Sequence, residues 1–198
     1  MHRFALTAMT AAALTVGLPA HAHETVYQAM LLGSSEIPAA VTPGSGIATV
    51  TVDFDLLTMR VQVTFADLIG TTTASHIHCC TVTPGAANVG VATQTPSFTG
   101  FPTGVTSGSY DHTFDMSLAS SYNAAFITAN GGTVGSAFNA LVAGMDSGNA
   151  YLNVHTTTFP GGEIRALLVP VPEPETYALM LSGLGVLALA ARRRRLQG

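Results

Sequence analysis

The chain has 198 residues, of which 47% are hydrophobic, and its formal charge is −4 with histidines neutral. Five of the seven basic residues lie at the two ends, so residues 23–171 contain only Arg60 and Arg165 against nine carboxylates, a formal charge of −7. So acidic a surface cannot neutralise a phosphate backbone, which excludes nucleic acid and anionic lipid surfaces as partners and leaves polysaccharides, cations or other proteins.

The N-terminal residues have the organisation of a secretory signal peptide. Arg3 provides a positive start, residues 4–18 form an apolar segment, and Ala20-His21-Ala22 presents small residues at the two positions that signal peptidase reads. We therefore expect signal peptidase to cleave after Ala22. Residues 1–22 are then the signal peptide, and residues 23–170 have a length that suits one domain with a normal core.

Strands dominate the predicted secondary structure of this domain. Apolar and polar residues alternate over residues 47–54 and again over 59–66, which indicates two half-buried strands joined at residues 55–58. Loops rich in glycine, proline, serine and threonine separate the other segments. The same reasoning predicts further strands at residues 26–32, 74–80, 109–116, 151–155 and 163–169.

One region has helical spacing instead. Apolar residues between Gly135 and Gly148 recur with the period of a helix, and residues 121–129 predict a second, shorter helix. We therefore predict a mainly β domain, an antiparallel β-sandwich or barrel with one or two short helices. The residues that define the longer helix are Ala137, Phe138, Leu141, Val142 and Met145.

Three histidines form a candidate metal site. His76 and His78 are two residues apart on a predicted strand, so their side chains project from one face with Cα atoms about 7 Å apart, and both imidazoles can reach one ion. His155, in a later strand, supplies a further nitrogen, and His112 is a weaker candidate. Imidazole ligands suit copper or zinc. The alternative is that all of them are hydrogen-bonded structural histidines and the domain has no cofactor.

Cys79 and Cys80 are the only cysteines, and they are neighbours. Such a pair cannot close a long loop, so in an exported protein it does not act as an ordinary structural disulfide. Two interpretations remain open. The pair forms a vicinal disulfide, or free thiolates join the histidines around zinc or copper, with Cys80 on the same strand face as His76 and His78.

Several segments of the domain resemble the chordin-type domain, CHRD. The sequence from Ala150 to Arg165 is AYLNVHTTTFPGGEIR, and the chain before it contains Ser75-His76-Ile77-His78, Tyr27–Leu31 and Glu36-Ile37-Pro38. The resemblance covers residues 25–168. It implies an extracellular, all-β domain without an established catalytic activity.

The C-terminal residues combine three signals in a fixed order. Pro172-Glu173-Pro174 is followed by an uncharged apolar run of 16 residues, 176–191, and then by the arginines 192–195. At 1.5 Å per residue the run is about 24 Å long, which spans a membrane when the arginines snorkel. The arginines hold their end in the cytoplasm, and the prolines keep the triplet extended and accessible to a protease.

This order of signals resembles the PEP-CTERM sorting tail of Gram-negative bacteria. The resemblance implies that an exosortase recognises residues 171–198, removes this tail, and passes the domain from an inner-membrane intermediate to the outer surface or the extracellular matrix. The alternative is an ordinary membrane anchor that stays on the protein.

The sequence therefore predicts an exported surface or matrix protein that binds or scaffolds, associated with exopolysaccharide or biofilm. Its predicted partners are signal peptidase and exosortase during export, the membrane before processing, and exopolysaccharide or matrix proteins afterwards. The alternative of a different class is a copper or zinc redox enzyme, or a metal-storage protein, that uses His76, His78 and His155. No general base stands beside the histidines in the sequence, which favours binding over catalysis.

Overall fold

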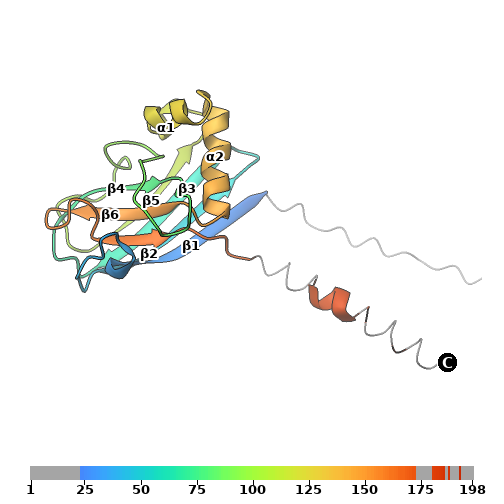
Figure 1. The fold of residues 1–198 in the computed structure, drawn as a ribbon, viewed down its shortest axis with the longest axis horizontal. Coiled ribbons are helices and arrows are strands. Elements are labelled where there is room, and N and C mark those ends of the chain that lie inside the picture. Colours follow the sequence, from blue (N-terminus) through green and yellow to red (C-terminus); the bar gives the residue numbers. More distant parts are fainter. Residues whose placement is uncertain (1–22, 173–179, 186, 188–191, 193–198) are drawn as a thin grey trace, which may run out of the picture.

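The computed structural model describes residues 23–172, 180–185, 187 and 192 (Figure 1). Residues 23–172 form seven strands, two α-helices and two single-turn 3₁₀ helices. The strands are β1 (Glu24–Leu32), β2 (Ser45–Asp53), β3 (Thr58–Ala66), β4 (Thr72–His78), β5 (Gly108–Asp115), β6 (Tyr151–Thr156) and β7 (Ile164–Leu167). The helices are η1 (Gly33–Ser35), η2 (Ala119–Ser121), α1 (Ala124–Ala129) and α2 (Val134–Asp146).

The strands form one antiparallel sheet in the order β4-β6-β7-β1-β2-β3-β5. The predicted mainly β, antiparallel fold with short helices is therefore confirmed. The β2–β3 hairpin turns at Asp53, whose carboxylate accepts hydrogen bonds from the backbone N–H groups of Asp55 and Leu56, both at 2.9 Å. β1 joins the two halves of the sheet, because it pairs with β2 along its whole length but with β7 only at Leu32↔Arg165.

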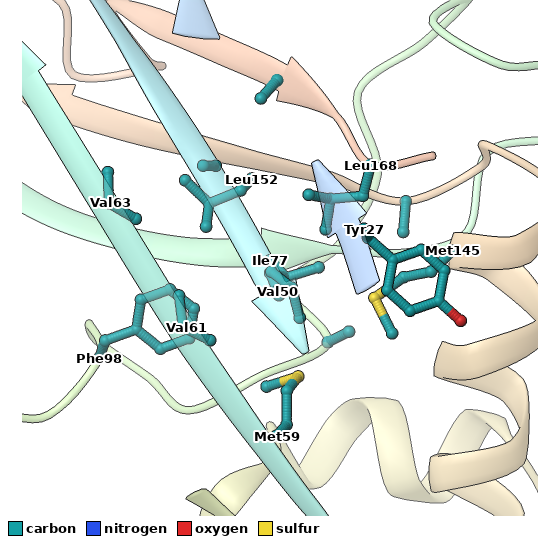
Figure 2. Packing of buried hydrophobic residues seen from close by; sticks show 14 of the residues in the cluster. Tyr27, Val50, Met59, Val61, Val63, Ile77, Phe98, Met145, Leu152 and Leu168 are labelled. Carbon is teal, nitrogen blue, oxygen red and sulfur yellow. The ribbon is translucent and has the colours of Figure 1, made fainter. Parts of the chain in front are cut away.

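The sheet curls so that both halves bury apolar side chains in one core. Alternate residues of β2 and β3, such as Val50 and Val61, meet Ile77 of β4 and Leu152 of β6, and all four are fully buried (Figure 2). This arrangement follows from the period-two pattern, since each strand has one apolar face. The opposite face of β4, β6 and β7 points away from this core, and it carries the candidate site.

Helix α2 closes one end of the core next to the shorter helix α1 (Figure 1). It begins after Thr133, whose hydroxyl accepts a hydrogen bond from the backbone N–H of Ser136 at 3.1 Å in a capping box. It buries Phe138 and Leu141 in the core. Gly144 lets the helix approach the two cysteines, because a Cβ atom at this position would overlap both sulfur atoms.

A buried carboxylate connects the loops before β2 and β4 to the end of β6. Glu163 accepts hydrogen bonds from the hydroxyls of Thr42 and Thr156 and from the backbone N–H groups of Ile69 and Gly70. Burial alone would raise the pKa of Glu163, but these hydrogen bonds favour the charged form more strongly and hold the pKa below its ordinary value. Glu163 is therefore a structural residue and is not paired with Arg165.

The predicted processing signals lie mostly outside the described residues. Residues 1–22, with the cleavage site after Ala22, are not described, and neither are Glu173 and Pro174. Pro172 is exposed and belongs to no helix or strand. Among the parts of the chain that the structure describes, no helix is long and apolar enough to cross a membrane. The predicted span at residues 176–191 is described only in part and stays a prediction.

Candidate metal centre

The three histidines meet on the outer face of the sheet, at the β4 edge. His76 and His78 lie on β4 and His155 lies on β6, and one nitrogen of each can be chosen so that the three lie within 4.8 Å of one another. The centroid of the His76 ring lies 4.7 Å from that of the His78 ring and 4.6 Å from that of the His155 ring. This separation allows three imidazoles to bind one ion after small rotations.

The register of β4 and β6 produces this convergence. His76 is opposite Asn153 in the antiparallel ladder, and Ala74 is opposite His155. Residues two apart on a strand share a face, so His78, His76 and His155 occupy adjacent positions on the same face. Because both strands belong to the rigid sheet, the nitrogen atoms are held close together by the backbone itself.

Backbone carbonyl groups determine which nitrogens are available as ligands. Nδ1 of His78 lies 2.6 Å from the carbonyl oxygen of Val89, and Nδ1 of His155 lies 2.8 Å from that of Pro160. A carbonyl oxygen only accepts, so each Nδ1 carries the proton and each Nε2 keeps a free lone pair. Carbonyl partners of this kind commonly orient metal-ligating histidines.

The free ring nitrogens are buried and lack partners in the protein. Nε2 of His78, Nε2 of His155 and Nδ1 of His76 make no hydrogen bond with any described residue. A buried polar atom without a partner costs about 1–3 kcal/mol. Three such atoms on adjacent rings therefore form an unfavourable arrangement in the protein alone, which binding of a cation would relieve.

Electrostatics keep the cluster uncharged. Burial lowers the pKa of His76 to about 3, with further contributions from the neighbouring His78 and His155. Burial also lowers the pKa values of His78 and His155, although the carbonyl partners oppose the shift. At neutral pH all three imidazoles are therefore neutral, which is the form that binds a metal ion.

A buried ion pair lies beside the cluster. Nη2 of Arg165 pairs with the Glu36 carboxylate at 2.7 Å and also donates to the side chain of Asn88, and Arg165 is only 1% exposed. The guanidinium lies 3.9 Å from the centroid of the Tyr151 ring, and that ring stacks on His78 at 4.7 Å. Burial raises the pKa of Glu36, and the charge of Arg165 opposes this shift.

The sequence predicts structural ion pairs or hydrogen bonds for Arg165, but it does not predict that its partner is Glu36. Glu36 belongs to the Glu36-Ile37-Pro38 segment of the CHRD resemblance, and Arg165 ends the other quoted segment, so both were visible as motif residues. No local pattern indicates that they pair, because the contact joins the loop after η1 to β7. Asn88 completes the connection, since its side-chain amide donates to the carbonyl of Ile37 at 2.6 Å.

The cysteines stand apart from the metal cluster. The structure joins Cys79 to Cys80 by a disulfide, and neither cysteine belongs to the group of candidate ligands. Cys80 does not share a strand face with the histidines, because β4 ends at His78. The sulfur atoms of both cysteines instead lie close to Ala140 on α2, so the prediction of a thiolate ligand is wrong for this structure.

His112 is not part of the cluster either. It lies on β5, at the opposite edge of the sheet from β4, and its ring contacts Tyr110 and Phe114. Its consideration as a weaker candidate ligand was wrong, because β5 pairs only with β3. Among the described residues, only His76, His78 and His155 form a group of three candidate ligand residues.

Comparison with known proteins finds two family models that match the chain. The CHRD domain matches residues 27–168, and the PEP-CTERM protein-sorting motif matches residues 170–195. No curated protein and no solved structure matches the chain. The sorting motif indicates export, processing by signal peptidase and exosortase, and sorting to the cell envelope or surface.

Proposed function

The chain belongs to the CHRD domain family and carries a PEP-CTERM sorting motif, and from this premise we propose that it is an exported surface protein that binds one copper or zinc ion. The ligands are His76, His78 and His155. The observation that carries the proposal is the meeting of three histidine rings, one nitrogen of each lying within 4.8 Å of the others, while each ring also has a buried nitrogen with no hydrogen-bond partner among the described residues.

Two features support metal binding over a purely structural role for the histidines. Structural histidines are usually satisfied at both nitrogens, whereas here each ring has an unpaired buried nitrogen beside the other two. The carbonyl groups of Val89 and Pro160 also hold two of the rings in the tautomer that a metal ion needs. Neutral nitrogen ligands suit zinc(II) and copper(II).

The test is calorimetric titration of zinc(II) and copper(II) into full-length protein purified in detergent and stripped with a chelator. We expect one ion per chain with a Kd of about 1 µM or tighter. His78→Ala and His155→Ala should each weaken binding at least about tenfold, because each removes one of three ligands. His112→Ala is the matched control and should bind as the parent does. Millimolar binding, or equal losses in all three variants, would contradict the proposal.

A second candidate function is attachment to matrix polysaccharide. It is favoured by a groove of about 450 Å³ on the outer face of β2, β3 and β5. In the strand order, β7 and β1 separate these strands from β4 and β6, which carry the histidines. Hydroxyl, amide and carboxylate groups in this groove can exchange hydrogen bonds with sugar hydroxyls. The polar groups that line it belong to Thr49, Gln62, Thr64, Ser109 and Asp111.

Polysaccharide binding can be measured separately from metal binding. Exopolysaccharide isolated from the host should sediment the protein, and Gln62→Ala should reduce the bound fraction because it removes both a donor and an acceptor from the groove. His78→Ala should leave this binding unchanged. Sedimentation that is absent, or equal for Gln62→Ala and the parent, would count against the matrix role.

A further inference from the structure

The candidate metal site offers three ligands rather than four. Among the described residues, the group contains no cysteine, aspartate or glutamate in addition to the histidines. The cysteines are in a disulfide, Glu36 is paired with Arg165, and Glu163 is occupied by its four hydrogen bonds. Structural zinc sites have four protein ligands, whereas sites with three keep a position for an exchangeable ligand.

The charges around the site favour an anion as that fourth ligand. Three neutral imidazoles leave the double positive charge of a bound ion uncompensated. The nearest charged groups are Arg165 and Glu36, which neutralise each other, and the positive charge of Arg165 reaches both His78 and His155. The protein therefore supplies no net negative charge to the ion.

Asn153 presents a second, independent sign of a missing ligand. It is 1% exposed, it lies opposite His76 in the ladder, and its side chain approaches the His78 ring. Its Oδ1 atom has no partner among the described residues, whereas its Nδ2 atom faces the carbonyl of Gly161 at 3.5 Å and interacts with the Glu36 carboxylate. The amide thus holds an acceptor without a partner beside the metal ligands.

A cavity lies among the loops that surround the site. It has a volume of about 360 Å³, and its lining includes Glu36, Asn88 and Pro160. Gly161 and Gly162 form part of its wall, and a Cβ atom at Gly162 would overlap Glu36 and crowd Asn153. The glycine at this position therefore lets the Glu36 and Asn153 side chains pack against the backbone at the wall of this cavity.

We propose that the ion held by His76, His78 and His155 keeps a fourth position occupied by water, which exchanges for a small monovalent anion, and that Asn153 positions this exchanging ligand. The exchange breaks the bond from the metal to the water oxygen, forms a bond from the metal to the anion, and releases the water without any change of oxidation state. Asn153 accepts a hydrogen bond from bound water through Oδ1, and a rotation of its side-chain amide lets Nδ2 donate one to a bound anion. This inference rests on the proposed metal binding.

The test uses full-length protein loaded with cobalt(II), whose visible absorption depends on the ligands around the metal, and sodium azide as the probe. We expect azide to change the absorption spectrum to a saturating limit. Failure of zinc(II), copper(II) and cobalt(II) alike to bind would remove the proposed metal function itself. If cobalt(II) binds but azide leaves its spectrum unchanged, the proposed exchangeable fourth position is refuted, whereas the proposed metal binding is not.

The role of Asn153 is tested by the azide affinity of cobalt-loaded variants. Asn153→Ala should weaken azide binding about tenfold while cobalt(II) remains bound, and Asn153→Ser should recover part of the loss because a hydroxyl restores a donor and an acceptor. Asn139→Ala, at an exposed position of α2, is the matched control. Equal azide affinity in Asn153→Ala and the parent would overturn the positioning role. If Asn153→Ala does not fold, the same comparison between Asn153→Ser and the parent decides it.

Discussion

The metal-free protein should lose stability in mild acid because of His76. The pKa of this buried imidazole is about 3 in the folded protein and about 6.5 in the unfolded chain. Between these values the unfolded chain binds a proton that the folded protein does not, so the free energy of unfolding falls as the pH falls, by about 1.4 kcal/mol per pH unit. From pH 7.5 to pH 4.5 this amounts to about 2.7 kcal/mol for His76 alone.

The assay is urea denaturation of chelator-treated protein at several pH values between 7.5 and 4.5, compared with His76→Asn. The variant cannot gain this proton, so its free energy of unfolding should fall by about 2.7 kcal/mol less than that of the parent over the same range. His112→Asn, which leaves the cluster intact, should keep the steep dependence of the parent. Identical pH dependence in the parent and His76→Asn would refute the argument that burial keeps this histidine neutral.

Three further predictions concern packing, a buried carboxylate and processing. Gly144→Ala should destabilise the domain by about 1–3 kcal/mol in urea denaturation because its methyl group overlaps both cysteine sulfurs, whereas Gly135→Ala, with open space on the same helix, should not. Glu163→Gln should cost about 2 kcal/mol at pH 7, and it should flatten the loss of stability that the parent shows as the pH falls below the ordinary pKa of glutamate, because the lowered pKa of Glu163 stabilises the folded protein only while the carboxylate is charged; Glu24→Gln, at an exposed position, should do neither. Mass spectrometry of the surface form should find a C-terminus near Pro172-Glu173-Pro174, and a full-length chain as the sole surface form would contradict tail removal.

The alternating pattern was sufficient to predict the sheet, but it could not determine the end of β4. The pattern extended this strand to Cys80, whereas the ladder with β6 ends at the pair His78↔Tyr151 because β6 begins at Tyr151. Beyond that pair, the backbone N–H of Cys79 bonds to the carbonyl of Gly90 in a loop. The end of a strand thus depends on its partner strand, which a local pattern does not contain.

The candidate site was predictable to the same extent. The His-x-His spacing places His76 and His78 on one face of any strand, whatever the fold. The approach of His155 depends on the register between β4 and β6, and the pairing of Glu36 with Arg165 depends on how the loop after η1 folds over the sheet. Local periodicity carries neither relation, since both join segments far apart in the chain.

The size of the core indicates whether a metal ion at the histidines serves folding or binding. Small metal-dependent domains fold only with their ion because they bury too few apolar side chains. Here every strand and both α-helices contribute buried apolar residues to one core, and the histidines lie on the opposite face of the sheet. The domain therefore has the means to fold without the ion, and β4 and β6 hold the three nitrogens together beforehand. Binding then requires little rearrangement, which is typical of a site that serves binding rather than folding.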